Sequence, residues 1–261
     1  MELPDTHAMA PEVPVEVQRV GIVRVAMPPL RVDGGVLEPV FKLFVSLPSS
    51  MRGAHISRCY RALSLAYRES SGIEVCSRAA EHLLDLHEYS LWSEASMGGN
   101  WLVKSNSPLE KLPGYEPRRL WVCFKAKRGR GLVSKRMRVS LFGVTTCPCA
   151  YNVVYALTGY EGETHMQRAL GTAEVLTTPN ASITPSDLAN AISSSMSSET
   201  HQVLKRGEEG DVVHRAISRR RFAEDVAREI AARLASLSEE KLPSSSKVFV
   251  RVRSLESIHT Y

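Results

Sequence analysis

The sequence predicts an α+β fold in which two similar sets of antiparallel strands each carry a pair of helices on one face. Segments with alternating apolar residues are typical of strands, and apolar residues three or four positions apart are typical of helices. These segments follow the order strands, two helices, strands, and the same order then occurs again. Antiparallel sheets with helices gathered on one face define the α+β class.

The first half is predicted to span residues 15–107, after a proline-rich arm at residues 1–14. Its expected elements are the strands Val15–Ala26 and Val36–Leu47, the helices Arg58–Ser70 and Ser77–Tyr89, and the extended segment Leu91–Ser105. Glycine pairs are typical of tight turns, so Asp33-Gly34-Gly35 is expected to join the first two strands. For the same reason Gly98-Gly99 is expected to form a hairpin turn inside the extended segment.

A stretch rich in proline and glycine, residues 108–117, is predicted to link the first half to a second half at residues 118–261. The expected elements are the strands Arg118–Ala126, Lys135–Thr145, Arg168–Leu176 and Lys247–Leu255, and the helices Pro185–Met196 and Arg219–Leu237. The last helix has the clearest pattern, because its apolar residues recur every four positions. Both halves leave sheet edges open, which favours pairing between subunits.

Composition limits the classes of function. No apolar run approaches the roughly 18–20 residues that span a bilayer, and the N-terminus lacks the basic and apolar regions of a secretory signal. A cytoplasmic protein without a membrane partner is therefore expected. The formal net charge of +5 favours anionic ligands. Nucleic acid is not expected among them, because the seven Lys and Arg of residues 125–138 have few aromatic neighbours and fit a charged hairpin better.

Four segments contain residue types that could do chemistry. They are RGAHISR at 52–58, TTCPC at 145–149 followed by HMQR at 165–168, LKRGEE at 204–209 followed by RFAED at 221–225, and LESIH at 255–259. Arginines at a helix start can bind an anion, and Cys with His suits a borderline divalent metal. Each segment also has an ordinary interpretation, such as a capped helix, a buried free cysteine, a surface ion pair or a chain terminus.

Together these segments resemble the type IB GTP cyclohydrolases and their archaeal relatives in the methanopterin pathway. The six short runs occur in the order of that family, and ELPD at 2–5 with RVGIVRV at 19–25 resembles the archaeal branch. The resemblance implies the tunnelling fold, with two tandem halves in one chain and active sites between the subunits of a homotetramer. It also implies GTP as the substrate.

The resemblance further implies roles for individual residues. The implied ligands of one divalent metal are Cys147, His165 and Glu209, with His259 as a further ligand or neighbour. The groups expected to act on the substrate are Cys149, Glu224 and Glu256, and Glu224 is also expected to bind the guanine edge. The residues expected near the phosphates are Arg52, His55, Arg58 and Lys205. The segment between Cys149 and His165 is longer than in bacterial members, so a bulged loop is expected there.

The implied reaction is the hydrolytic opening of the guanine imidazole ring with release of formate. The archaeal resemblance favours Fe(II), with Zn or Mn as alternatives, and favours 7,8-dihydroneopterin 2',3'-cyclic phosphate as the product. The alternative within the family is the bacterial-type reaction, which gives 7,8-dihydroneopterin triphosphate for folate. The more distant alternatives are a nitrile reductase of the same fold and a basic nucleic-acid-binding module.

Overall fold

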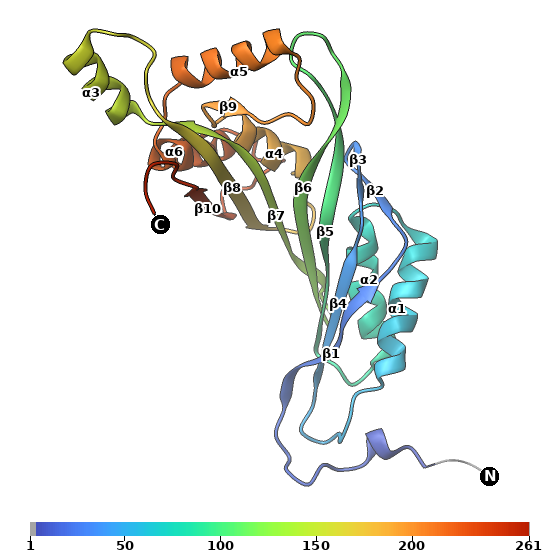
Figure 1. Ribbon diagram of the computed structural model, residues 1–261. Helices are drawn as coiled ribbons and strands as arrows, with labels where there is room; N and C mark the ends of the chain where they lie inside the picture. Colours follow the sequence, from blue (N-terminus) through green and yellow to red (C-terminus); the bar gives the residue numbers. More distant parts are fainter. Residues whose placement is uncertain (1–3, 261) are drawn as a thin grey trace.

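The computed structural model describes residues 4–260, and its centre is one long, twisted antiparallel sheet (Figure 1). The strands are β1 (Val17–Ala26), β2 (Leu30–Val32), β3 (Gly35–Leu37), β4 (Val40–Leu47), β5 (Trp92–Asn106), β6 (Pro113–Lys127), β7 (Gly131–Thr146), β8 (Met166–Thr177), β9 (Ser198–Glu199) and β10 (Lys247–Ser254). The main path through the sheet is β1-β4-β5-β6-β7-β8-β10. Residues 1–3 of the predicted arm and the last residue of the predicted second half lie outside the described residues.

The described part of the chain contains six α-helices and one short 3-10 turn. They are η1 (Thr6–Ala8), α1 (Ile56–Glu69), α2 (Glu74–Leu86), α3 (Pro148–Thr158), α4 (Pro185–Ser193), α5 (Arg206–Ser218) and α6 (Ala223–Ala235). The predicted α+β class with antiparallel pairing is confirmed. Two helices, α3 and α5, lie where the sequence was expected to form loops. No described helix combines the length and the apolar character needed to cross a bilayer.

One face of the sheet is apolar along its whole width, and the helices cover it. Strand pairing aligns Leu43 with Ala95, Met97 with Val122, and Met137 with Val175, so these side chains share one face. Helix α2 covers this face over β4, β5 and β6, and α1 packs against α2 and β1, whereas α4 and α6 cover the face over β7, β8 and β10 (Figure 1). Both helical pairs therefore pack on the same face, as predicted. A division into tandem halves at residues 108–117 remains a prediction.

The predicted hairpin turn at Gly98-Gly99 is wrong. Strand β5 runs through both glycines without interruption and pairs residue by residue with β6. The glycines are there because other chain segments approach closely. A Cβ added to Gly99 would lie 1.9 Å from the carbonyl oxygen of Glu38, and one added to Gly98 would lie 3.0 Å from the Trp121 ring. The real turn joins Asn106 to Pro113, and residues 113–117 belong to β6.

Replacement of Gly99 by alanine should test this close packing. We expect Gly99→Ala to lower the free energy of unfolding by roughly 1–3 kcal/mol or more, because backbone atoms cannot move away as a side chain could. The measurement is urea denaturation followed by circular dichroism. Gly210→Ala is the matched control. Gly210 lies in α5 with no atom within 4 Å of its added Cβ, so alanine should leave stability unchanged or raise it by up to about 1 kcal/mol. A Gly99→Ala protein as stable as the wild type would contradict this explanation.

Candidate functional site

The ends of β7 and β8 bring Cys147 and His165 side by side. These strands pair in register up to Thr146 and Met166, and the next residue on each side is Cys147 and His165. The Cys147 backbone N–H donates to the His165 carbonyl oxygen at 3.1 Å. The eighteen-residue separation in sequence is therefore closed by the strand register.

Helix α3 begins directly at this pair, in place of the expected bulged loop. Cys147 is its N-cap, and the Cys147 thiol sulfur accepts a hydrogen bond from the Ala150 N–H at 3.3 Å. Pro148 occupies the first helical position, which suits a residue without an N–H. Cys149 is exposed in the first turn. The helix thus presents both sulfur atoms at its N-terminus, where the helix dipole favours negative charge.

Two of the other three cysteines, Cys59 and Cys76, belong to the core, and Cys123 lies on the opposite face of the sheet. Cys59, Cys76 and Cys123 are buried, and burial raises the pKa of Cys59 to about 11 and that of Cys123 to about 12. Thiols with such pKa values stay protonated near neutral pH and are poor metal ligands. Among the five cysteines, Cys147 and Cys149 are the two that solvent reaches.

The C-terminal segment returns to the Cys147–His165 pair. Nδ1 of His165 lies 2.9 Å from Oε1 of Gln167 and 3.4 Å from the Ser257 hydroxyl. The Gln167 amide donates to Glu256 at 3.4 Å. His165, Gln167 and Glu256 therefore form a chain of polar contacts, which brings Glu256 close to the Cys147–His165 pair. His259 is exposed three residues farther on.

Glu209 and Lys205 lie elsewhere in the single chain. They belong to the start of α5, which is attached to the β5–β6 turn. The attachment is made by the neighbouring residue Glu208, whose carboxylate is buried and accepts the backbone N–H groups of Leu109 and Glu110, each at 3.0 Å. Glu209 is exposed beside it.

The chain alone does not assemble the predicted ligand set of Cys147, His165, Glu209 and His259. Among residues 4–260, the sole group of three or more potential metal-ligating side chains is a different one, formed by Asp5, His7 and His55. Of the four predicted ligands, Cys147 and His165 are the two that the strand register of one chain brings together.

Glu224 lies exposed in the first turn of α6. The ordinary interpretation of this residue was an ion pair with Arg228. In the structure Arg228 pairs instead with Asp225, at 3.3 Å. The base of α6 is held close to the Cys147 segment, because the Arg221 N–H donates to the Thr146 carbonyl at 3.1 Å. Arg220 lies over the ring of Tyr151 on α3, 3.6 Å from its centroid.

Three of the predicted phosphate-binding residues, Arg52, His55 and Arg58, lie at the opposite end of the sheet from Cys147, whereas Lys205 is the N-cap of α5. These three residues come after β4 in the sequence. Val45 of β4 pairs with Ser93, Ser93 pairs with Ala126, and Ala126 pairs with Leu132, so Val45 lies level with Leu132 of β7. Fourteen residues of β7 then separate Leu132 from Thr146, which corresponds to roughly 45 Å of strand. Figure 1 likewise shows the loop before α1 and helix α3 at opposite ends of the sheet.

The local contacts of these residues differ. Arg58 donates to the Leu86 carbonyl at 2.9 Å, so its guanidinium joins α1 to α2. Arg52 is half-exposed and lies 3.7 Å from Glu12 of the arm. His55 is the N-cap of α1, and its Nε2 lies 3.2 Å from the Asp5 carboxylate. Of the three, Arg52 has the side chain with most freedom to meet a phosphate.

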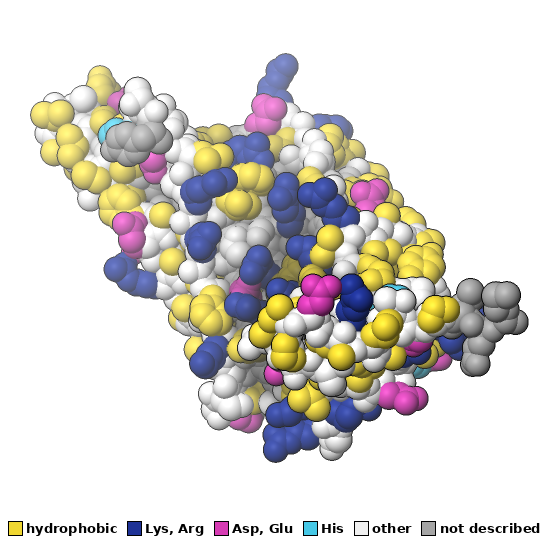
Figure 2. Space-filling model, turned by 90° about the horizontal axis from the view of Figure 1, so that it is seen from below, with side chains coloured by type: hydrophobic (Ala, Val, Ile, Leu, Met, Phe, Trp, Pro, Cys, Tyr) yellow, Lys and Arg dark blue, Asp and Glu magenta, His cyan; other side chains and the backbone are white. Residues whose placement is uncertain are grey.

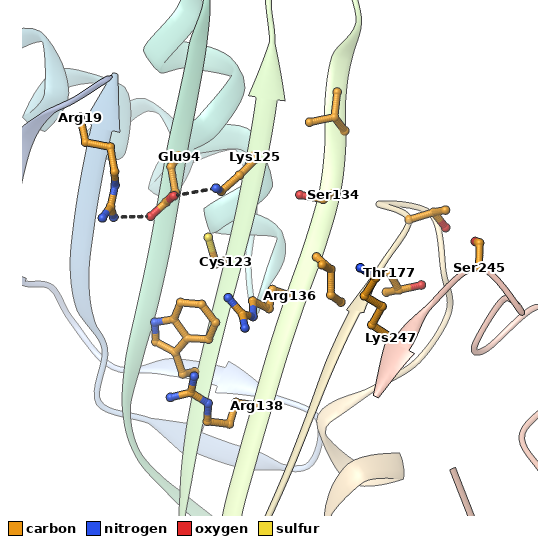
Figure 3. A pocket seen from close by; sticks show the side chains of 14 residues that line it. Arg19, Glu94, Cys123, Lys125, Ser134, Arg136, Arg138, Thr177, Ser245 and Lys247 are labelled. Atoms are coloured by element: carbon orange, nitrogen blue, oxygen red, sulfur yellow. Dashed lines mark hydrogen bonds and ion pairs between the residues drawn. The ribbon is translucent and has the colours of Figure 1, made fainter. Parts of the chain in front are cut away.

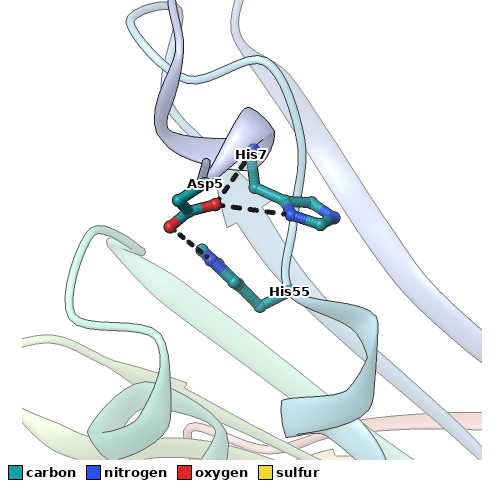
Figure 4. A group of neighbouring side chains, drawn as sticks. All are labelled: Asp5, His7 and His55. Carbon is teal, nitrogen blue, oxygen red and sulfur yellow. Dashed lines mark hydrogen bonds and ion pairs between the residues drawn. The ribbon is translucent and has the colours of Figure 1, made fainter. Parts of the chain in front are cut away.

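Asp5 and His7 form the part of this group that sequence reasoning missed. The Asp5 carboxylate contacts a ring nitrogen of both His7 and His55 (Figure 4). The signal was present in the ELPD and RGAHISR runs, which were recognised separately as parts of the resemblance. Their contact could not be read from the sequence, because the arm has no periodicity that would place it against the loop.

The sheet face that carries no helices is basic and hollowed. Figure 2 shows Lys and Arg side chains gathered around the hollow, and Figure 3 shows its lining. Its volume is about 740 Å³. Two buried carboxylates interrupt the positive charge. Glu94 lies 2.7 Å from Arg19 and 3.3 Å from Lys125, and Glu174 bonds to two arginines of β7.

Comparison with known proteins identifies the family to which these features belong. Residues 3–261 match the family model described as type I GTP cyclohydrolase folE2. The chain belongs to this family. Its members are hydrolases that act on the imidazole ring of GTP, as the sequence motifs predicted, rather than nitrile reductases or nucleic-acid-binding modules.

The similar family members include archaeal proteins named GTP cyclohydrolase MptA. The protein of Methanocorpusculum labreanum is 29% identical, over 100% of this chain and 94% of the relative. The protein of Methanococcus aeolicus is 30% identical, over 98% of this chain and 93% of the relative. The protein of Methanoculleus marisnigri is 30% identical, over 100% and 93%. These relatives favour the archaeal branch of the family over the bacterial one.

The attachment of α5 should depend on pH through Glu208. Burial raises the pKa of this carboxyl, but hydrogen bonds outweigh that effect and lower the pKa to about 2. The donors are the Ser107 side chain and the backbone N–H groups of Lys205, Glu110 and Leu109. A lowered carboxyl pKa stabilises the folded state above the ordinary value, about 4.5, and this stabilisation is lost as the pH falls toward 2.

We therefore expect Glu208→Gln to be less stable than the wild type at pH 7, with the difference shrinking between about pH 4.5 and pH 2. Denaturant unfolding at several pH values measures this difference. Glu209→Gln, one residue away and exposed, should change the stability little at any pH. A Glu208→Gln deficit that stays constant down to pH 2 would rule out this role for the carboxylate.

Proposed function

We propose that this chain hydrolyses GTP to 7,8-dihydroneopterin 2',3'-cyclic phosphate with release of formate, as a cytoplasmic enzyme of pterin synthesis in the manner of methanopterin pathways. The observation that carries this proposal is the pairing of Cys147 with His165 at the ends of β7 and β8, within a chain that matches the family over residues 3–261. The similarity to MptA proteins supports the cyclic-phosphate product over a retained triphosphate.

The Cys147–His165 pair suits a divalent metal. A sulfur and an imidazole nitrogen are ligands that Zn and Fe(II) accept, and both side chains are partly open to solvent. Gln167 and Ser257 contact Nδ1 of His165 and fix the direction of the ring, as partners of metal-binding histidines do. Such a metal, with Fe(II) favoured, supplies the activation of water for attack on the guanine ring. Glu209 and His259 are proposed to complete the ligand set.

The remaining residues act on the substrate in this proposal. The Glu224 carboxylate accepts hydrogen bonds from N1–H and the exocyclic amine of guanine, a paired arrangement that favours the purine edge. Cys149 and Glu256 transfer protons during ring opening, since both lie next to the Cys147–His165 pair. Arg52, Arg58 and Lys205 neutralise the phosphates, and His55 lies in the same substrate-binding run as Arg52 and Arg58.

These groups require more than one copy of the chain. About 45 Å of strand separates Arg52, His55 and Arg58 from Cys147, which is far longer than GTP. We propose a homotetramer of chains with tandem tunnelling-fold halves, in which one subunit contributes the Cys147 end of the site and another contributes the Arg52 end. The open edges of β1 and β10 can pair between copies.

Helix α3 supports the same arrangement. None of its residues, all of which the structure describes, is buried, although Val153, Tyr155 and Leu157 are large and apolar. An apolar helix exposed along its length is costly in water, and a second copy of the chain would cover it. Because α3 starts at Cys147, such a contact would place the second copy at the metal end of the site.

The ligand assignment predicts the behaviour of two variants. Cys147→Ala and His165→Ala should each lose bound iron and lower GTP turnover by about 100-fold or more, because the metal loses a ligand. Metal analysis and detection of formate under anaerobic conditions measure both effects. His214→Ala, at an exposed position of α5, is the control and should keep metal and activity. Full metal content with normal turnover in both variants would contradict this ligand assignment.

Mixing of inactive subunits should test the shared site. Arg52→Glu impairs the phosphate end and Cys147→Ala impairs the metal end, so co-refolded mixtures contain some sites with both ends intact. For random assembly of equal amounts, about a quarter of wild-type activity should return. Mixtures of Cys147→Ala with His165→Ala should stay inactive, because both defects lie in the same end. The absence of any recovery in the first mixture would contradict a site built from two chains.

A further inference from the structure

The second group of metal-ligating side chains lies at the N-terminal arm, roughly 45 Å of strand away from Cys147 in the same chain. Asp5, His7 and His55 each offer one ligand atom, and these three atoms all lie within 4.8 Å of one another. Two imidazoles and one carboxylate form a ligand set that borderline divalent cations such as Zn²⁺ and Fe²⁺ accept.

The two contacts of Asp5 are close to the spacing of ligand atoms around a cation. Oδ2 of Asp5 lies 3.2 Å from Nε2 of His55, and Oδ1 of Asp5 lies 3.5 Å from Nδ1 of His7. Ligand atoms around a tetrahedral zinc ion are about 3.3 Å apart, given bond lengths near 2.0 Å. The three side chains converge in Figure 4, and their carboxylate and ring nitrogens point toward a common region.

The backbone holds both sides of this group in place. On the arm, the His7 N–H donates to Oδ1 of Asp5 at 3.0 Å and closes the 3-10 turn η1. On the loop, the Gly53 N–H donates to the His7 carbonyl at 3.2 Å, and a Cβ on Gly53 would lie 3.0 Å from the His7 ring. Glycine at this position therefore allows the His7 ring to lie against the loop.

His55 is oriented from behind. Its backbone N–H donates to the Tyr89 hydroxyl at 3.3 Å, and its carbonyl oxygen lies 3.2 Å from Nε2 of the buried His87. Its ring has no hydrogen-bond partner at Nδ1 among the described residues, so Asp5 is the ring's one polar contact there. The hydrogen bond from His55 lowers the pKa of the Asp5 carboxyl, which keeps that group charged near neutral pH.

We propose that Asp5, His7 and His55 bind one borderline divalent cation that clamps the N-terminal arm to the loop before α1. Apart from these side chains, the contacts of the arm with this loop are two backbone hydrogen bonds and a 3.7 Å ion pair between Glu12 and Arg52, within the described residues. A cation with ligands on both segments joins them far more strongly. Three protein ligands leave positions open for water or a phosphate oxygen.

Within one chain this group is separate from the Cys147–His165 pair, and its binding of a cation can be measured without GTP turnover. A Co²⁺ titration separates the two, because a thiolate ligand gives a charge-transfer absorption band and an imidazole–carboxylate set gives none. Full-length protein stripped with chelator should bind two Co²⁺ per chain near pH 7.5.

His7→Ala and Asp5→Asn should each lose one equivalent of Co²⁺ and keep the thiolate band. Cys147→Ala should lose the band and keep the equivalent at the arm. His214→Ala is the matched control and should bind like the wild type. A His7→Ala protein that binds as much Co²⁺ as the wild type would overturn the proposed site. If the Cys147 site alone fails, the wild type binds one equivalent without the band, and His7→Ala binds none.

Proteolysis tests the clamp itself. The Glu-specific protease can cut the arm at Glu12, whose side chain is 89% exposed. Co²⁺ or Zn²⁺ should slow this cleavage by about 10-fold or more in the wild type, because cleavage requires the arm to detach. The metal should have no effect in His7→Ala. Equal cleavage rates of the wild type with and without metal would overturn the clamp, whatever the outcome for GTP turnover.

Discussion

The register of the long antiparallel strands is the constraint on which the rest of this structure depends. Strands β5, β6 and β7 each contain 15 or 16 residues, and their pairing is continuous across the middle of the sheet. Register places Cys147 next to His165 without any direct bond between their side chains. The same register holds Arg52 and His55 far from that pair. The sheet therefore keeps the two parts of the proposed site at opposite ends of one chain.

The two faces of the sheet are stabilised in different ways. The helix-covered face buries apolar side chains, and the exposed face balances arginines and lysines with two buried glutamates. Glu94 and Glu174 each contact two cations, so the buried charges are paired. Removing either carboxylate would leave neighbouring cations without compensation, a loss that is larger than the gain from forming the pair. The exposed face can thus remain charged and hollow while the strands beneath it stay paired.

The sequence predicted the elements whose residues carry a period. Helix α6 was predicted because its apolar residues recur every four positions, and strand β10 because its apolar residues alternate. Helix α3 was missed because it is apolar on all sides, so it has no amphipathic pattern to detect. Gly98-Gly99 was misinterpreted because a glycine that permits close approach and a glycine that permits a turn look the same in sequence. The two roles can be told apart only in the folded structure, where Glu38 and Trp121 lie against the glycines.

The candidate site was likewise predictable only in part. The residues of the site could be named from six short runs, but their grouping could not, because it depends on contacts between distant segments. Pairing of β7 with β8 confirms that Cys147 and His165 are neighbours, whereas Glu209 is held at the β5–β6 turn by Glu208. The roles of Cys149, Glu224 and His259 stay predictions.

The arm and α3 differ from the sheet because the contacts within one chain do little to hold either of them in place. The arm has few contacts with the loop before α1, and α3 has an apolar surface that its own chain leaves open. Each segment lies beside one half-site, at opposite ends of β7. A cation at the arm and a second copy at α3 would stabilise these segments at the two places where the sheet cannot. In this proposal the sheet sets the distance between the two half-sites, and the attached segments determine when each half-site is complete.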